Sequence, residues 1–136
     1  MAGRLYLDTS AVLRAALEAG TTPDVEQRIR AAEVLITSRL SLVESTRVLL
    51  RVRLRADVPE SRLADAEREI DTVWGRCEVW EISRAVCETA AVVAPSKPLR
   101  ALDAIHLATF VLARRRIADL ELLTDDDRLR TAAAVV

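Results

Sequence analysis

Cysteine, histidine, glycine and lysine are scarce in this sequence, and each shortage excludes a class of site. Cys77 and Cys87 stand ten positions apart without a C-x-x-C pair, and His106 is the only histidine. This excludes a zinc site and a redox dithiol, so we expect both cysteines to fill the core. Three glycines cannot supply a dinucleotide-binding fingerprint. The only lysine, Lys97, lies in a predicted loop, which argues against a phosphorylated response regulator with a lysine late in its sheet.

Long apolar runs and a strong net charge are also missing. The chain has no apolar segment of signal-peptide length at its start, and no apolar run approaches the roughly 18 residues that span a bilayer. We therefore expect a cytoplasmic protein without a membrane segment. The formal net charge is −1, so no global basic field marks nucleic-acid binding, and a polyanion would need a local patch. With 136 residues the chain can bury the core of one domain, residues 1–136.

Short apolar runs alternate with helical patterns along the chain. Strands are predicted at residues 5–7, 34–37, 77–82 and 120–124, with a possible edge strand starting at 135–136. Helices are predicted at residues 11–18, 24–32, 41–55, 60–73, 84–93, 100–116 and 126–133. This alternation favours an α/β fold, with a central parallel sheet of four to five strands covered by helices on both faces.

Capping signals mark the starts of two of these helices. Thr22, which precedes a proline, is predicted to cap the helix at 24–32. Ser41 and Glu44 stand at capping-box spacing, which predicts that the long helix begins at Ser41. The break before the next helix predicts that helices 41–55 and 60–73 form a hairpin.

Acidic side chains stand at strand ends and at helix starts. They are Asp8 after the first strand, Glu44 and Asp103 near the starts of two long helices, and three aspartates at 125–127 after the last strand. In open α/β sheets, ligands bind outside the carboxyl ends of the strands. The sequence therefore favours a site at that end, provided that these acids converge.

Most of these acids also have a purely structural explanation. Asp8 or Ser10 can cap the helix that follows, because both side chains accept backbone N–H bonds well. Glu44 begins a stripe with arginines that is typical of a solvated helix face. One of the three aspartates at 125–127 is expected to cap the last helix, which leaves the others to point into a cleft.

Asp103 is harder to explain by structure alone, because its helix is apolar almost all round. A first-turn acid gains about 0.3–1 kcal/mol from the helix dipole, against several kcal/mol for desolvating an ion. A cation or a water-filled cleft explains Asp103 better.

Converging acids would need a cation. Two like charges about 4 Å apart repel by about 4 kcal/mol at an effective dielectric near 20. Oxygen ligands without histidine or cysteine favour Mg²⁺ or Mn²⁺ over zinc. Such a site would hydrolyse a phosphodiester by activating a water molecule.

Four segments occur in a characteristic order and spacing over essentially the whole chain. They are Leu7-Asp8-Thr9-Ser10-Ala11, Ser41-Leu42-Val43-Glu44, Leu102-Asp103-Ala104-Ile105-His106-Leu107-Ala108 and Leu123-Thr124-Asp125-Asp126-Asp127-Arg128-Leu129. Together they resemble the PIN-domain ribonucleases of the VapC toxin type, from bacterial type II toxin–antitoxin systems. A haloacid-dehalogenase-like phosphatase is less similar, because Ser10 stands where its second aspartate is needed.

The resemblance implies the sheet order 3-2-1-4-5 and a set of metal-binding and catalytic acids. The metal-binding acids it implies are Asp8, Glu44, Asp103 and Asp126, the last because it stands two residues after Thr124. The cofactor implied is Mg²⁺ or Mn²⁺. The activity implied is endoribonuclease cleavage by a homodimer that a VapB antitoxin neutralises; the alternative is a catalytically inactive PIN-fold module that binds RNA or protein.

Supporting roles follow from the same comparison. Ser10 and Thr124 are placed to orient carboxylates by hydrogen bonds, although helix capping explains each hydroxyl at least as well. Asp125 and Asp127 flank the last acid. Three arginines are candidates for contacts with RNA phosphates, although solvated arginines are the ordinary interpretation; they are Arg47, Arg51 and Arg100. His106 is interpreted as a packed, hydrogen-bonded core residue in preference to a catalytic base.

Overall fold

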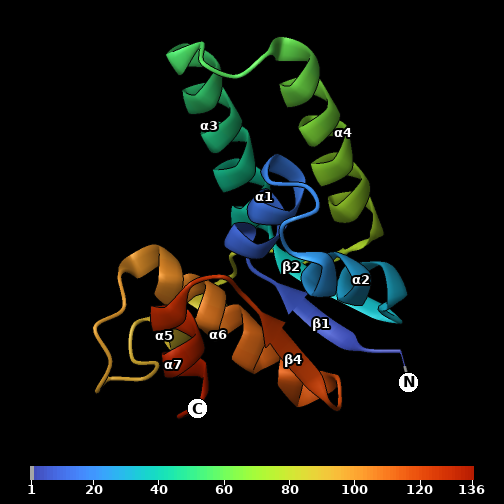
Figure 1. Ribbon diagram of the computed structural model, residues 1–136. Helices are drawn as coiled ribbons and strands as arrows, with labels where there is room; N and C mark the ends of the chain where they lie inside the picture. Colours follow the sequence, from blue (N-terminus) through green and yellow to red (C-terminus); the bar gives the residue numbers. More distant parts are fainter. Residues whose placement is uncertain (1) are drawn as a thin grey trace.

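The first strand, β1 (Arg4–Leu7), is an interior strand of a parallel sheet with the order β3-β2-β1-β4 (Figure 1). The other strands are β2 (Val34–Ser38), β3 (Glu78–Trp80) and β4 (Leu120–Leu123). The computed structural model describes residues 2–136. Met1, which the predicted single domain 1–136 includes, lies outside the described residues. The predicted parallel sheet and the order of its first four strands are confirmed.

β1 is buried on both faces, as its continuous apolar sequence predicts for a central parallel strand. Leu5, Tyr6 and Leu7 are each at most 1% exposed. Because successive side chains of a strand point to opposite faces, Leu5 and Leu7 enter one core cluster and Tyr6 enters the other. Tyr6 is therefore the polar group that β1 sends into the second core.

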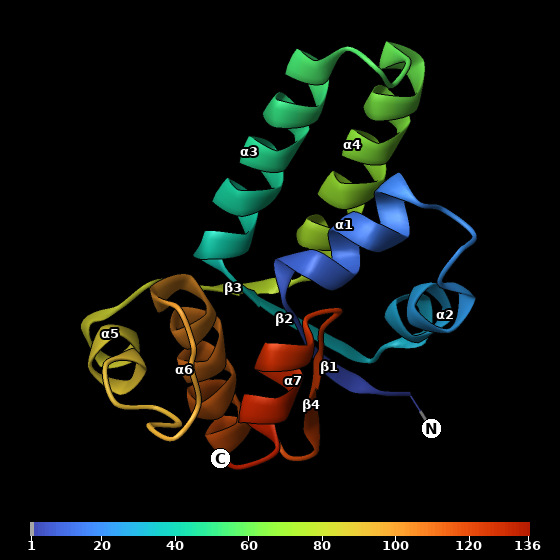
Figure 2. The same cartoon turned by 60° about the vertical axis from the view of Figure 1, so that its left-hand side comes forward.

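Helices cover both faces of this sheet, as predicted (Figures 1 and 2). The Leu5 face is covered by α1 (Thr9–Leu17), α2 (Pro23–Ala31), α3 (Arg39–Arg55) and α4 (Glu60–Arg76). The Tyr6 face is covered by α6 (Ala101–Arg116) and α7 (Asp127–Ala133), and α5 (Arg84–Ala90) packs against α6. No helix among residues 2–136 is both long and apolar enough to cross a bilayer.

The predicted hairpin of α3 and α4 is present, and it extends away from the sheet as an arm (Figures 1 and 2). Ala56 ends α3 in the left-handed conformation, with φ of 57°. Arg53 joins the two helices through ion pairs with Glu60 and Glu67. Glu44 lies near the start of α3, so the base of this arm adjoins the sheet.

The start of α3 differs from the prediction. The helix begins at Arg39, because Ser38 is the last residue of β2 and its Oγ accepts a hydrogen bond from the N–H of Leu40. Ser41 is fully buried inside the helix and receives a hydrogen bond from Thr37. The predicted capping box of Ser41 and Glu44 is therefore wrong, and Glu44 is free for other contacts.

Several local predictions are corrected as well. Residues 135–136 form no edge strand, because their N–H groups bond back to the last turn of α7. Thr22 occupies the N-cap position of α2, but its side chain makes no cap hydrogen bond. Cys87 is exposed and does not fill the core, whereas Cys77 is half-buried and packs against it. The third strand has three residues instead of the six predicted.

Candidate active site

Asp8 leaves β1 at the carboxyl end of the sheet and is 5% exposed. It is the N-cap of α1, where its Oδ1 accepts the N–H of Ala11. Ser10 Oγ donates to Asp8 Oδ1 at 2.9 Å, and Thr124 Oγ1 donates to Asp8 Oδ2 at 2.9 Å. The capping explanation and the site explanation of Asp8 therefore apply to the same side chain.

Ser10 and Thr124 also tie the start of α1 to the segment after β4. Leu7 and Leu123 are partners in the parallel register, which brings the two strand ends together. The backbone N–H of Asp125 donates to Ser10 Oγ, and that of Asp126 donates to Thr124 Oγ1, both at 3.0 Å. The two hydroxyls thus hold Asp8 and shape the loop that leads to Asp126.

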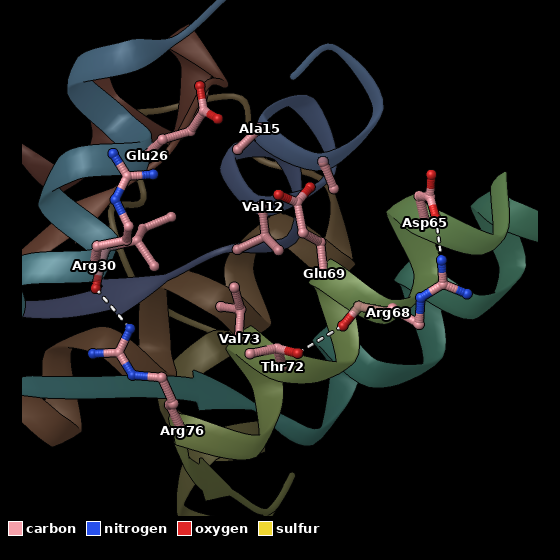
Figure 3. A pocket seen from close by; sticks show the side chains of 12 residues that line it. Val12, Ala15, Glu26, Arg30, Asp65, Arg68, Glu69, Thr72, Val73 and Arg76 are labelled. Atoms are coloured by element: carbon pink, nitrogen blue, oxygen red, sulfur yellow. Dashed lines mark hydrogen bonds and ion pairs between the residues drawn. The ribbon is translucent and has the colours of Figure 1, made fainter. Parts of the chain in front are cut away.

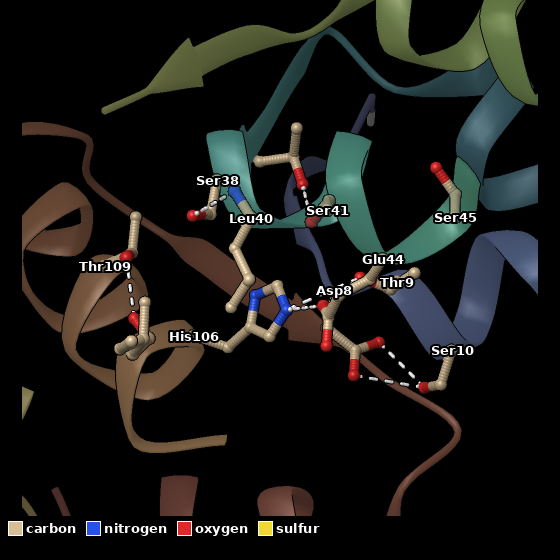
Figure 4. A network of polar contacts seen from close by, with 12 residues as sticks. Asp8, Thr9, Ser10, Ser38, Leu40, Ser41, Glu44, Ser45, His106 and Thr109 are labelled. Atoms are coloured by element: carbon tan, nitrogen blue, oxygen red, sulfur yellow. Dashed lines mark hydrogen bonds and ion pairs between the residues drawn. The ribbon is translucent and has the colours of Figure 1, made fainter. Parts of the chain in front are cut away.

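Glu44 turns inward from α3 towards α1 and α6 (Figure 4). Its Oε1 accepts a hydrogen bond from Thr9 Oγ1 at 2.6 Å and lies 2.7 Å from His106 Nε2. Partial burial raises the pKa of Glu44, but the hydrogen bonds from His106 and Thr9 outweigh it and hold that pKa below its ordinary value. Glu44 is therefore an ionised, oriented carboxylate and not part of a solvated stripe.

His106 is 3% exposed, so its interpretation as a packed, hydrogen-bonded residue is confirmed. Its Nδ1 lies 2.9 Å from the Tyr6 hydroxyl. The Asp8 carboxylate lies beside the Glu44–His106 pair (Figure 4). Burial raises the pKa of Asp8, and the hydrogen bonds from Ser10 and Thr124 offset this only in part.

Glu44, Asp103 and Asp126 line one cleft of about 540 Å³, together with Arg100, Ala101, Leu102 and Arg128. Burial raises the pKa of Asp103, and the negative charges of Asp126 and Glu44 raise it further. Three acids from α3, α6 and the loop before α7 therefore influence one another across this cleft.

Asp126 also caps α7, since its Oδ1 accepts the N–H groups of Arg128 and Leu129. The expectation that the capping aspartate and the cleft aspartate are different residues is wrong. Asp125 is held by an ion pair with Arg14 at 2.7 Å, and Asp127 by one with Arg130.

The donor set of the cleft fits a hard cation. All its charged acceptors are carboxylate oxygens, and the only histidine is already bonded to Glu44. Such oxygens suit Mg²⁺ or Mn²⁺. Among residues 2–136, no three acidic, histidine or cysteine side chains stand close enough together to form a complete metal site as they lie. This wide spacing of the acids is expected, because ionised carboxylates repel one another when no cation lies between them.

Comparison with known proteins identifies the family. Residues 5–135 match the family model described as PIN domain. The chain belongs to the PIN-domain family. Ribonuclease VapC46 of Mycobacterium tuberculosis (strain ATCC 25618 / H37Rv) is 32% identical over 130 residues, covering 95% of this chain and 89% of that protein. Ribonuclease VapC35 of the same strain is 35% identical over 133 residues, with the same coverage of each chain. These identities place this PIN domain among those of the VapC type.

Solved structures share the fold of this PIN domain. PAE2754 from Pyrobaculum aerophilum superposes with a TM-score of 0.66 at 22% identity, covering 97% of this chain and 81% of that one. A toxin–antitoxin complex from Klebsiella pneumoniae contains a chain with a TM-score of 0.60 at 21% identity, covering 91% and 87%. At these identities the likeness concerns the arrangement of the backbone.

Four arginines without a side-chain partner among residues 2–136 lie at the cleft or on the helix that carries Glu44. Arg47 and Arg51 on α3, and Arg100 at the start of α6, make no side-chain hydrogen bond or ion pair with residues 2–136. Arg128 lines the cleft, and its guanidinium is likewise unpaired within the described part of the chain. Sequence reasoning missed Arg128, although it stands two residues after Asp126.

A second hollow of about 450 Å³ lies between α1, α2 and α4 (Figure 3). Its interior is lined by apolar side chains such as Val12 and Ile29. Charges of both signs surround it, including an ion pair of Asp65 with Arg68, and Arg76 is bonded to a backbone carbonyl of α2. Because its acids stand among arginines, this hollow is not the metal-site candidate of the PIN domain.

Proposed function

We propose that this PIN domain is an endoribonuclease toxin that hydrolyses RNA phosphodiester bonds with Mg²⁺ or Mn²⁺. The observation that carries the proposal is the cleft shared by Glu44, Asp103 and Asp126. Asp8 does not line this cleft, but it is buried at the end of β1 and is linked through Thr124 to the loop that carries Asp126. The relatives named Ribonuclease VapC support the assignment to RNA.

The metal is assigned to Asp8, Glu44, Asp103 and Asp126. When bound, the cation supplies an activated water and neutralises charge on the attacked phosphate. Ser10 and Thr124 keep the Asp8 carboxylate in one orientation. Asp8 and Asp103 both have a raised pKa because of burial, so a cation relieves an unfavourable state of the fold as well as serving the reaction.

The contacts with RNA are assigned to four arginines that have no side-chain partner among residues 2–136. Arg100 and Arg128 line the cleft, and Arg47 and Arg51 lie on the helix that carries Glu44. Phosphate contacts of this kind position a nucleic acid without reading its sequence. The arginines would therefore hold the backbone of the RNA across the acids.

A small antitoxin protein is the proposed partner. One structural neighbour is a chain of a toxin–antitoxin complex, and another is VapBC2 from Rickettsia felis bound to a DNA fragment, with a TM-score of 0.59. The homodimer implied by the family resemblance remains a prediction. Because RNA and a freshly made antitoxin are met in the cytoplasm, we place the protein there.

Cleavage of RNA by the purified, antitoxin-free chain tests this function. We expect cleavage with Mn²⁺ or Mg²⁺, none with EDTA, and loss of cleavage in Asp8→Asn and Asp103→Asn. Asp119→Asn is the matched control, because Asp119 is exposed and lies outside the cleft. Unchanged rates in Asp8→Asn and Asp103→Asn would refute the site, and RNA binding without cleavage by the wild type would favour the inactive module.

A further inference from the structure

A buried chain of hydrogen bonds joins three elements behind the cleft. Tyr6 on β1 contacts His106 on α6 at 2.9 Å, and His106 contacts Glu44 on α3 at 2.7 Å. Tyr6 is completely buried, and its ring meets the imidazole edge-to-face. Nothing in the proposed reaction uses Tyr6 or His106 directly, so their contact with a cleft acid requires a separate explanation.

The hydrogen positions along this chain follow from the hydrogen-bonding capacity of each group once the imidazole is taken as neutral. An ionised carboxylate only accepts hydrogen bonds, so the short contact with Glu44 requires a hydrogen on His106 Nε2. In a neutral imidazole, Nδ1 is then an acceptor, and the phenolic hydrogen of Tyr6 fills it. Burial, and then the charge of Asp8, raise the pKa of Tyr6 well above its ordinary value, so that hydrogen stays on the phenol.

The two carboxylate oxygens of Glu44 therefore differ in their hydrogen-bond partners. Oε1 receives both Thr9 Oγ1 and His106 Nε2. Oε2 accepts no hydrogen bond from any side chain or N–H group of residues 2–136, and the Glu44 side chain is 27% exposed and lines the cleft. Two donors on one oxygen restrict the rotation of a long side chain that would otherwise sample several orientations.

We propose that His106 is a positioning residue: held in its Nε2–H form by Tyr6, it fixes Glu44 so that Oε2 remains available to a ligand in the cleft. The proposal rests on the proposed function, since the ligand meant is the divalent cation of that site. It differs from a purely structural role of His106, which would require only that the ring fill space and satisfy Tyr6.

The form of the imidazole can be measured directly, because the chain contains a single histidine. A long-range ¹H–¹⁵N spectrum of the labelled full chain therefore shows one ring. At neutral pH and without metal, we expect a protonated Nε2 and an unprotonated Nδ1, and Tyr6→Phe should shift the Nδ1 signal. The opposite tautomer, or a ring protonated on both nitrogens, would overturn the proposal.

Two amide variants separate the contact with Glu44 from the contact with Tyr6. The amide nitrogen of glutamine lies about where imidazole Nε2 lies, and that of asparagine about where Nδ1 lies. His106→Gln can therefore still donate to Glu44, whereas His106→Asn can reach only Tyr6. Both variants replace the ring by an amide, so they are matched in polarity.

Calorimetric titration with Mn²⁺ alone and cleavage kinetics provide the readouts. We expect His106→Asn to weaken Mn²⁺ binding and lower kcat by about 10- to 100-fold, as for other residues that orient metal ligands. KM for RNA should stay unchanged, and His106→Gln should recover most of the loss. Equal behaviour of the two folded variants, or a wild-type value in His106→Asn, would contradict positioning.

Failure of the proposed function has a different signature. A wild-type protein that neither takes up Mn²⁺ nor cleaves RNA would refute that function, while the imidazole spectrum would still decide whether Tyr6 and Glu44 hold His106 in one form. If the His106 variants do not fold, Tyr6→Phe keeps the ring in place. We then expect lower kcat with unchanged KM, and an unaltered kcat would count against the proposal.

Discussion

Replacing Asp8 by asparagine and by alanine separates its role in the fold from its role in the site. Alanine removes the N-cap acceptor of α1, which costs about 1 kcal/mol. It also leaves the Ser10 and Thr124 hydroxyls short of an acceptor, at about 1–3 kcal/mol for a buried polar group. At roughly 4 °C per kcal/mol for a chain of this size, Asp8→Ala should lower Tm by about 8–16 °C.

Asparagine should behave differently. It keeps the shape of Asp8 and an oxygen for the N–H of Ala11, and it removes a charge that burial disfavours. We expect Asp8→Asn to melt within about 3 °C of the wild type, which corresponds to a change of less than about 1 kcal/mol in the free energy of unfolding. Thermal unfolding followed by circular dichroism in EDTA gives these values.

Unfolding in the presence of Mn²⁺ tests whether Asp8 binds the metal. A ligand that binds the folded state raises Tm, so the wild type should be stabilised by Mn²⁺ and neither Asp8 variant should be. A Tm of Asp8→Asn as low as that of Asp8→Ala would refute the hydrogen-bond argument. An undiminished response of Asp8→Asn to Mn²⁺ would refute the assignment of Asp8 to the metal.

The pH dependence of the same pair follows from the direction of the shift. Burial raises the pKa of Asp8 in the folded state, so between the ordinary and the raised pKa the folded chain binds more protons than the unfolded chain. Stability then falls as pH rises through that window. In EDTA, the advantage of Asp8→Asn over the wild type should therefore grow with pH and become constant above the raised pKa. A gap that is independent of pH would contradict this reasoning.

The remaining predictions concern arginines and thiols. Arg100→Ala and Arg128→Ala should each raise KM for RNA and reduce the slope of log affinity against log salt by about 0.7–1. Arg115→Ala, near the far end of α6, is the charge-matched control, and equal losses in all three variants would indicate a general charge effect. Burial raises the pKa of Cys77 to about 12, whereas Cys87 is exposed. Brief alkylation followed by mass spectrometry should therefore modify Cys87 at least about tenfold faster, and equal labelling would contradict the burial of Cys77.

The sheet and the place of the acids could be predicted from local patterns. Leu5 to Leu7 form a continuous apolar run, which is typical of a strand buried on both faces, and Asp8 follows it directly. A parallel sheet gathers strand ends at one edge, so the acids after β1 and β4 had to approach one another. The strand order required the family resemblance, since alternation alone leaves several orders open.

Contacts between distant residues could not be predicted in this way. The spacing of Glu44 with nearby arginines is the ordinary pattern of a solvated helix face, yet its partners Thr9 and His106 come from two other helices. The choice of Ser38 over Ser41 as the cap of α3 likewise depends on the sheet, because Ser38 pairs with Trp80 of β3 and ends β2 directly before the helix. Sequence patterns involve only residues that are close along the chain, whereas these contacts depend on elements that the fold brings together.

The position of β1 between β2 and β4 sets an order of events during synthesis. β1 is synthesised first, but it can pair with β4 only after translation has passed residue 123. Thr124 and Asp126 are synthesised after that point. A nascent chain still attached to the ribosome at residue 110 has the histidine and most of the acids but no loop to close the pocket. The strand order therefore delays the formation of a complete nuclease site until the ribosome has synthesised nearly the whole chain.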